Sequence, residues 1–485
     1  MRRSLMIMVA AAAAVACGTP AAYASTGAAH SAAAPTTWGT AEVVPGTAAL
    51  NTQGNAGTSK VSCPSTGNCA VAGTYRTLIK GRVHTRPFVD TQTNGKWHSA
   101  KQVPGITALG RVGTVADVQS LSCASAGNCA VTGYYYVGPY DNNTESYVAS
   151  ETNGTWGAAQ EIAGGLPTNS DAQIQSVSCG APGDCSAGGA YYPAGGGGGP
   201  VQAFVVSETG GTWGTAEEVP GTAALNAGDN AQVNSVSCSS AGNCSAGGYY
   251  ASSTRSQQAF VVSETGGTWG MAQEVPGTAT LNSGDSAQLV SVSCSSAGNC
   301  SAGGDYATSA PSLQAFVVKQ TDGTWSTARQ VPGLAALNTG DQAQFVSVSC
   351  SSAGNCSAGG YYYDTSSTHN EPFVVNQTHG TWGKAQEVPG IAALYPTSDT
   401  FFSSVSCAAA GDCSAVGSYS PASLDSQMWV VSETGGTWGP AEAAPGTGGG
   451  AFAGSVSCAS ATRCVAGGSN PDGSGDPQAI ILSSS

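Results

Sequence analysis

The chain has 485 residues, 41% of them hydrophobic and 9% charged, and carries a formal net charge of −14 at pH 7. The negative charge argues against nucleic acid and anionic membrane surfaces as partners, because both are recognised by basic patches. Charged residues fall well below the roughly 25% of ordinary globular proteins, and the length allows several ordinary domains or one large repeat array.

The first residues have the pattern of a bacterial-type secretory signal peptide. Two arginines precede an apolar stretch at 5–16, and Ala22-Tyr23-Ala24 offers a small-residue cleavage site. The stretch is too short to span a membrane. Lipoprotein processing at Cys17 is an alternative that the better-formed cleavage site disfavours. We therefore expect a secreted, extracellular protein with three parts: a signal peptide at 1–24, a flexible Ala/Ser-rich segment at 25–35 and one folded domain at 36–485.

A tryptophan then recurs every 56 to 59 residues, in step with a Cys-x5-Cys pair. A self-similar period of this length indicates a solenoid, a propeller or an array. The tryptophans are Trp38, Trp97, Trp156, Trp213, Trp269, Trp325, Trp382 and Trp438. The cysteine pairs are Cys63/Cys69, Cys123/Cys129, Cys179/Cys185, Cys238/Cys244, Cys294/Cys300, Cys350/Cys356, Cys407/Cys413 and Cys458/Cys464.

Each repeat contains four short strand patterns. The repeat that begins at Ser235 reads SVSC, CSAGGYY, QAFVVSET and TWGTAEEV, with Gly, Pro and Asn signals between the segments. Such alternating and β-branched runs predict strands, and no segment has a sustained helical period. The residues before each tryptophan are mostly NG, GG, DG or HG, which predict a type I′ hairpin between the third and fourth strands.

The two ends of the chain complement each other. The first tryptophan, in PTTWGTAEVVPG, follows no β-run, whereas the last cysteine pair is followed by the strand pattern QAIILSSS. A fourth strand from the N-terminus paired with a third strand from the C-terminus would make a composite blade that closes a ring, as in propellers. We therefore predict an all-β fold: a single eight-bladed β-propeller with four antiparallel strands per blade.

This repeat resembles the secreted bacterial propellers built from Asp-box repeats, and propeller lectins. The likeness is architectural and covers most of the chain, and the resemblance implies a propeller fold. The Asp box itself is not matched, because Ser207 to Trp213 is one residue shorter than that motif and has Thr209 at the aspartate position.

The cysteine pairs are interpreted as one disulfide per blade, between the first and second strands. Secretion favours disulfides, and closing so short a loop contributes roughly 2 kcal/mol. Zinc binding would need further cysteine pairs or histidines nearby, so we expect no metal and no cofactor. The tryptophans are assigned to the core between blades in preference to ligand platforms.

The candidate binding face carries the loops between the second and third strands and the connections between blades. These loops vary in length and begin with tyrosines, and variable loops on a rigid scaffold often bind ligands. Tyrosine rings and carboxylates suit sugars; packing at strand ends and Asx turns are the alternative roles. The candidate ligand-binding residues are Tyr134, Tyr135, Tyr191, Tyr192, Tyr249, Tyr250, Tyr306, Tyr361, Tyr362, Asp229, Asp285 and Asp341.

Catalytic residues are not indicated by any motif. The paired acids Glu217-Glu218 fall on an outer strand, and no serine elbow or phosphate-binding loop is present. We therefore expect a secreted, monomeric, non-catalytic protein that recognises a cell-surface or extracellular glycan. A protein-binding scaffold in a secreted assembly is the alternative, followed by a glycosidase or lyase.

One loop in the first complete repeat is basic on an otherwise acidic chain. Its cationic residues are Arg76, Lys80, Arg82, His84 and Arg86. Charge clusters are usually solvated surface; the alternative hypothesis is a contact for an acidic partner or polymer.

Overall fold

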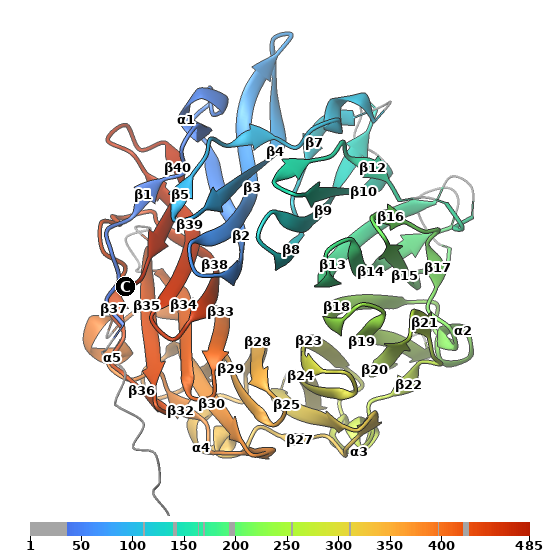
Figure 1. Ribbon diagram of the computed structural model, residues 1–485. Coiled ribbons are helices and arrows are strands. Elements are labelled where there is room, and N and C mark those ends of the chain that lie inside the picture. The colour runs from blue at the N-terminus through green and yellow to red at the C-terminus, as the bar shows by residue number, and fades with distance from the viewer. Residues whose placement is uncertain are drawn as a thin grey trace, which may run out of the picture. The chain divides into compact units, whose positions relative to one another are not determined.

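The computed structural model describes residues 36–109, 112–138, 143–162, 164–167, 170–193, 199–253, 256–309, 312–395, 397–420 and 426–485. The predicted signal peptide and Cys17 lie outside these residues. In the described part of the chain, each repeat folds into an antiparallel blade, and the blades follow one another around a ring (Figure 1). The predicted all-β, eight-bladed propeller is confirmed.

Within a blade the first strand is innermost, and the fourth strand forms two short outer pieces. Blade 1 consists of β2 (Ala56–Ser65), β3 (Asn68–Ile79), β4 (Arg82–Thr93), β5 (Lys96–Trp97) and β6 (Lys101–Gln102). Blade 2 consists of β7 (Val112–Ala116), β8 (Ser120–Ser125), β9 (Asn128–Val137), β10 (Asn143–Thr152), β11 (Thr155–Trp156) and β12 (Gln160–Glu161). Blade 3 consists of β13 (Asp171–Ala181), β14 (Asp184–Tyr192), β15 (Gln202–Thr209), β16 (Thr212–Trp213) and β17 (Glu217–Glu218). Blade 4 consists of β18 (Ala231–Ser240), β19 (Asn243–Ser253), β20 (Ser256–Thr265), β21 (Thr268–Trp269) and β22 (Gln273–Glu274).

The remaining blades repeat this order, except that blade 8 takes its outer strand from the N-terminal end. Blade 5 consists of β23 (Ala287–Ser296), β24 (Asn299–Ser309), β25 (Ser312–Thr321), β26 (Thr324–Trp325) and β27 (Arg329–Gln330). Blade 6 consists of β28 (Ala343–Ser352), β29 (Asn355–Asp364), β30 (His369–Thr378), β31 (Thr381–Trp382) and β32 (Gln386–Glu387). Blade 7 consists of β33 (Asp399–Ala409), β34 (Asp412–Ser420), β35 (Gln427–Thr434), β36 (Thr437–Trp438) and β37 (Glu442–Ala443). Blade 8 consists of β38 (Phe452–Ser460), β39 (Arg463–Pro471), β40 (Pro477–Ser483) and β1 (Glu42–Val43).

Short helices occupy the connections from one blade to the next. They are α1 (Thr47–Leu50), η1 (Ile106–Ala108), α2 (Thr222–Leu225), α3 (Thr278–Leu281), α4 (Leu334–Leu337) and α5 (Ile391–Leu394). Each begins after a Pro-Gly pair whose glycine is left-handed, with φ of 86° at Gly221 for example. Positive φ is available to glycine without steric cost, which explains the recurring Pro-Gly. No helix in the described residues is long and apolar enough to cross a membrane.

The ring is closed by the predicted composite blade. β1 pairs with β40 in antiparallel register, with Glu42 opposite Ile481 and Val43 opposite Ile480. Trp38 forms a further antiparallel bridge with Ser484. The N-terminal strand therefore covers the outer side of β40, so the C-terminal strand is not left as a free edge.

Hydrogen bonds between blades form a closed circle near the centre. The Cys238 N–H donates to Ser178 Oγ of the preceding blade at 2.9 Å. The equivalent bond from Cys63 N–H to Ser457 Oγ, also 2.9 Å, joins blade 1 to blade 8. The other donor–acceptor pairs are Cys123–Ser62, Cys179–Ser122, Cys294–Ser237, Cys350–Ser293, Cys407–Ser349 and Cys458–Ser406. This circle explains why serine precedes the first cysteine of every repeat.

The two glycines of the CSAGG motif allow close approach between and within blades. A Cβ on Gly303 would lie 2.3 Å from the ring of Phe345, which enters from the next blade. A Cβ on Gly304 would lie 1.9 Å from the Gln288 carbonyl oxygen, where β23 is bulged. Blade 7 has Val416 at the first of these positions, and blade 8 packs the small Ala453 against that cluster. Side-chain size is therefore matched across these two junctions.

The apolar core of the described residues is divided into one cluster at each of the eight blade junctions. The tryptophans belong to these clusters: Trp269 is 7% exposed, and its indole N–H donates to Ser207 Oγ of the preceding blade at 3.2 Å. The same contact joins Trp213 to Ser150 and Trp438 to Asn376. Assignment of the tryptophans to the core between blades is thus confirmed.

All eight predicted disulfides are present, and each joins the first and second strands of one blade. The two cysteines stand directly opposite each other, as Cys238 and Cys244 do. The bonds are Cys63–Cys69, Cys123–Cys129, Cys179–Cys185, Cys238–Cys244, Cys294–Cys300, Cys350–Cys356, Cys407–Cys413 and Cys458–Cys464. Eight disulfides are typical of a protein from an oxidising compartment.

The predicted hairpins before the tryptophans are also confirmed. In blade 2, Asn153 and Gly154 have φ of 50° and 78°, the positive values that a type I′ turn requires. The Gly154 N–H donates to the carbonyl oxygen of Gly127 at 2.9 Å, which ties this hairpin to the disulfide turn of the same blade.

Candidate functional site

The upper face is defined here as the side that carries the loops between second and third strands and the connections between blades. Near the centre of the upper face, each blade has one pair of residues that stand opposite each other on its first and second strands. The two side chains of such a cross-strand pair lie on the same face of the sheet. Seven pairs are directly opposed: Gly57/Thr74, Gln173/Ala190, Gln232/Tyr249, Gln288/Asp305, Gln344/Tyr361, Phe401/Ser418 and Phe452/Ser469. In blade 2 the Asp117 N–H donates to the Tyr134 carbonyl oxygen at 2.9 Å. Amide and aromatic side chains therefore dominate this inner ring.

Five of the nine predicted ligand-binding tyrosines are buried. Tyr250 is 3% exposed, and its hydroxyl donates to Glu274 on the outer strand at 2.9 Å. The hydroxyl of Tyr191 donates to Glu218 in the same way, and burial raises the pKa of Tyr191 to about 12. The buried rings are Tyr135, Tyr191, Tyr250, Tyr306 and Tyr362. Because their ring faces are covered, they act as strand-end packing, and replacing them with alanine would disturb the fold.

The other four tyrosines reach the surface. Tyr134, Tyr249 and Tyr361 are half-buried, and Tyr192 is 37% exposed. Tyr361 donates its hydroxyl to Gln344 Oε1 at 2.6 Å, and its ring meets Phe401 edge-on with centroids 5.2 Å apart. Of the nine predicted tyrosines, these four are the ones whose side chains a ligand could contact.

The three predicted aspartates are exposed in the connections between blades. Asp229, Asp285 and Asp341 have φ of 60°, 60° and 54°, a left-handed conformation that aspartate tolerates better than most residues. The Asp229 carbonyl oxygen accepts from the Val201 N–H at 2.8 Å. Turn geometry therefore accounts for the residue type; all three residues are exposed, and the Asp341 carboxylate also accepts from Gln314 at 3.4 Å.

The disulfide cysteines are residues of the core and are not accessible parts of a binding site. The second cysteine of every pair is buried, with exposed fractions from 2% to 5%, because each belongs to the apolar cluster of a blade junction. These second cysteines are Cys69, Cys129, Cys185, Cys244, Cys300, Cys356, Cys413 and Cys464. Among the described residues, no group of three or more His, Cys, Asp or Glu side chains could hold a metal ion. The cysteines therefore stabilise the fold, and a ligand would have to bind to other residues.

The residue that fixes the connections between blades is the asparagine of the repeated Leu-Asn-x-Gly-Asp motif, whose amide was expected to suit a sugar and is used by the backbone instead. Asn226 Oδ1 accepts from the N–H of Asn230 at 2.7 Å and of Ala251 at 3.3 Å. Its amide donates to the Val201 carbonyl oxygen at 3.0 Å in blade 3. The repeated Leu-Asn before each Gly-Asp was the available signal, since Asn282 and Asn338 make equivalent bonds.

A shallow groove of about 440 Å³ opens on the upper face between blades 8 and 1. Most other blades place Gln, Tyr or Phe at these inner positions, whereas blade 1 has Gly57 and Thr74. On the other wall stands Phe452, whose side chain is 51% exposed. Polar residues share the lining of the groove with Phe452; they are Asn55, Ser59, Thr74 and Ser469. The groove thus combines an exposed aromatic ring with several hydroxyl groups and an amide.

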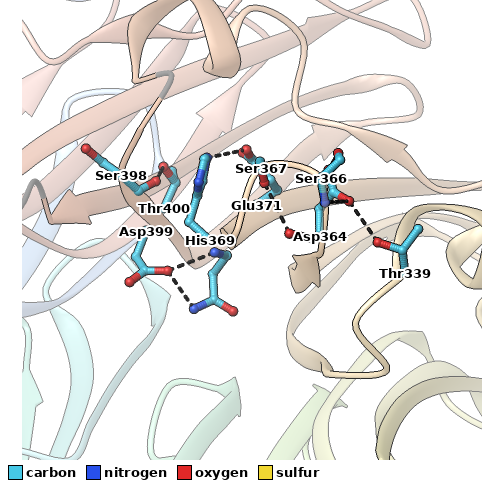
Figure 2. A network of polar contacts seen from close by, with 10 residues as sticks. Thr339, Asp364, Ser366, Ser367, His369, Glu371, Ser398, Asp399 and Thr400 are labelled. Carbon is cyan, nitrogen blue, oxygen red and sulfur yellow. Dashed lines mark hydrogen bonds and ion pairs between the residues drawn. The ribbon is translucent and has the colours of Figure 1, made fainter.

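A second polar cluster lies at the junction of blades 6 and 7 (Figure 2). His369 Nε2 and Glu371 Oε1 are 2.9 Å apart, a contact that is an ion pair when the imidazole is protonated. Burial raises the pKa of Glu371 to about 7, with nearby Glu387 adding to the effect and His369 opposing it. The Asp399 carboxylate of blade 7 accepts from the Asn370 N–H at 2.8 Å. The bonds from Asn370 fasten β30 of blade 6 to blade 7, whereas the contact between His369 and Glu371 lies within β30. Both His369 and Glu371 are less than 10% exposed.

Two smaller hollows lie on the opposite face, beside the disulfide turns. One, of about 280 Å³, lies between blades 4 and 5 and is lined by Asn243 and Glu264. The other, of about 260 Å³, lies between blades 6 and 7 and is lined by Asn355 and Glu433. Neither has an exposed aromatic side chain among its lining residues.

Comparisons with solved structures find similar chains of low identity. The polysaccharide lyase Uly1 is 10% identical, with 93% of this chain and 98% of that chain covered and a TM-score of 0.44. Sqt1 from Chaetomium thermophilum is 11% identical, with 90% and 96% covered and a TM-score of 0.46. A protein of unknown function from Dyadobacter fermentans is 9% identical, with 93% and 98% covered and a TM-score of 0.39. No protein family matches the chain, and no curated protein matches it.

Proposed function

We propose that the protein is a secreted recognition protein that binds an extracellular glycan in the groove between blades 8 and 1. The observation that carries this proposal is the exposed ring of Phe452 beside the hydroxyl groups of Thr74 and Ser469. An aromatic face covers the apolar C–H face of a pyranose, and hydroxyl and amide groups exchange hydrogen bonds with its edge.

Propeller geometry alone does not account for this groove. Gly57 is not in a left-handed conformation, and a Cβ there would meet its nearest neighbour, Ser469 Cβ, at an ordinary 3.4 Å. Larger residues are therefore compatible with the backbone, as Gln232 and Gln344 show at the equivalent position in blades 4 and 6. The groove is therefore open because Gly57 has no side chain, although the backbone at this position does not require glycine.

Two substitutions that restore the residue found in other blades test the proposal. Phe452→Gln removes the ring and should weaken glycan binding about fivefold, on the order of 1 kcal/mol for one stacking contact. Gly57→Gln fills the groove and should reduce binding at least about tenfold, because the ligand would have to displace a packed side chain. Binding would be measured on a glycan array and then by calorimetry with the best ligand.

The matched control is Phe401→Gln, which makes the same change in blade 7, outside the groove. All three variants should melt within a few degrees of the wild type. Equal binding by the wild type, Phe452→Gln and Gly57→Gln would reject the groove as the site, and a wild type that captures a protein but no glycan would favour a scaffold role.

A further inference from the structure

The basic side chains of this acidic protein are concentrated in one blade. Seven of its 15 lysines and arginines lie between residues 56 and 102, with Asp90 as the one acidic residue in that range. Asp90 and Arg86 are each 3% exposed, so neither contributes much to the surface, and six basic residues remain without an exposed acidic partner in that range. Blade 1 therefore presents a positive surface on a chain whose net charge is −14.

The positive surface includes a hairpin that extends beyond the neighbouring loops. β3 and β4 have 12 residues each, more than any other strand in the described residues, and they project from the ring (Figure 1). Arg76, Lys80 and Arg82 are exposed along this hairpin. Its tip also carries an exposed apolar cross-strand pair, Leu78 opposite Val83. By contrast, Arg86 is 3% exposed and donates to His84 Nδ1 at 2.8 Å, so these two residues stabilise the base of the hairpin.

The hairpin is continuous with the groove between blades 8 and 1. Thr74 lines the groove and lies on β3, and Arg76 follows two residues later on the same face of the strand. Two residues of strand span about 7 Å. The Arg76 N–H also donates to the carbonyl oxygen of Asn55, another residue of the groove, at 2.9 Å. A polymer that occupies the groove and continues along β3 would therefore meet Arg76 and then the tip.

Two acidic residues near the groove, Asp472 and Asp476, lie in the loop between β39 and β40 of blade 8. Asp476 is exposed, and its carboxylate lies beside Gly54 of the connection between blades 8 and 1. Asp472 accepts from the N–H groups of Ser474 and Asp476, which lowers its pKa and keeps it ionised. An anionic ligand in the groove would therefore be repelled by the loop of blade 8 and attracted by the hairpin of blade 1.

We propose that the glycan is an anionic polysaccharide, and that Arg76, Lys80 and Arg82 of the β3–β4 hairpin form its second contact. This inference rests on the proposed function of the groove and adds the chemical class of the ligand. The neutral lining of the groove takes the sugar ring, while the hairpin takes carboxylate or sulfate groups further along the chain.

The test uses two charged polymers and their uncharged counterparts: polygalacturonate with its methyl ester, and dextran sulfate with dextran. The wild type should bind at least one charged polymer about tenfold more tightly than its counterpart, and binding should weaken as salt rises. The triple variant Arg76→Gln, Lys80→Gln, Arg82→Gln should lose most of that difference and show a weaker salt dependence. If the difference is found with polygalacturonate, the hairpin recognises carboxylate groups; if it is found with dextran sulfate, the hairpin recognises sulfate groups.

The matched control removes three exposed positive charges elsewhere: Arg329→Gln, Lys384→Gln, Arg463→Gln. It should bind like the wild type. Equal binding of charged and uncharged polymers, with Phe452→Gln still reducing it, would leave glycan recognition in place and overturn the inference. Loss of binding in both triple variants alike would also overturn it, because net charge would then be the cause. Binding of none of the four polymers would overturn the inference and count against the proposed function.

Discussion

Deletion of Gln478 to Ser485 is expected to abolish the cooperative unfolding of the whole ring. The deleted segment contains most of β40, which pairs with β39 on one side and with β1 on the other. It also carries Ile480, Ile481 and Leu482, which are 2%, 2% and 0% exposed. Burying each such side chain is worth roughly 2–3 kcal/mol, against a total stability of about 5–15 kcal/mol for a typical protein. Calorimetry should therefore show a broad transition or none.

A second chain separates the effect of the strand from that of chain length. Here Gln478 to Ser485 are replaced by eight glycine and serine residues, and this chain should behave like the truncated one. A sharp melting transition at the wild-type temperature in either chain would mean that the ring does not depend on the composite blade.

Stability is expected to fall as the pH rises from 5 to 8, because several buried carboxyl groups resist ionisation. Burial raises the pKa of Glu433, which is 1% exposed, from 4.5 to about 7. Desolvation likewise raises the pKa of Asp90 and Asp305 to about 7. Between the ordinary and the raised pKa the folded state binds more protons than the unfolded state, so the free energy of unfolding decreases with pH. The melting temperature at pH 8 should lie several degrees below that at pH 5.

Glutamine at position 433 isolates one of these groups. Glu433 accepts from Ser357 Oγ at 3.0 Å and from Asn376, and blades 5 and 6 have Gln320 and Gln377 at the equivalent position. Ionising this group in the folded state costs up to about 3 kcal/mol. Glu433→Gln should therefore raise the melting temperature at pH 8 and change it little at pH 5. A variant that loses stability equally at both pH values would contradict this explanation.

Asp364 has a pKa shift in the opposite direction and therefore affects stability at low pH. Hydrogen bonds from Ser366 and Thr339 lower the pKa of Asp364 to about 2. Its contribution is present above pH 4 and is lost as the pH falls through the lowered pKa. The stability maximum is accordingly expected near pH 4 to 5.

The fold could be predicted from the sequence because each of its determinants is local or periodic. The disulfides follow from a five-residue spacing, the hairpins from pairs such as Asn153-Gly154, and ring closure from strand patterns at the two ends. The orientation of the tyrosines could not be predicted in the same way. Tyr249 and Tyr250 lie on opposite faces of one strand, and the bulge between Val233 and Ser235 shifts the register beside them. Which ring is buried therefore depends on the packing of the neighbouring strands.

The groove was not predictable because its walls come from opposite ends of the chain. Gly57 and Phe452 each depart from the glutamine found at this position in blades 3 to 6. The two departures become meaningful only when β2 and β38 meet at the closing junction, where Val61 N–H donates to Ser455 Oγ at 2.9 Å. Comparison of the repeats shows that each of these two residues is unusual. It does not show that both residues line the same groove.

The most direct test of glycan recognition in the groove is a crystal structure of the protein with the oligosaccharide that binds best. The proposal predicts a sugar ring stacked on Phe452, hydrogen-bonded to Thr74 or Ser469, with the chain continuing toward Arg76. A ligand bound instead on the opposite face, in the hollow beside Glu264 or the one beside Glu433, would contradict it.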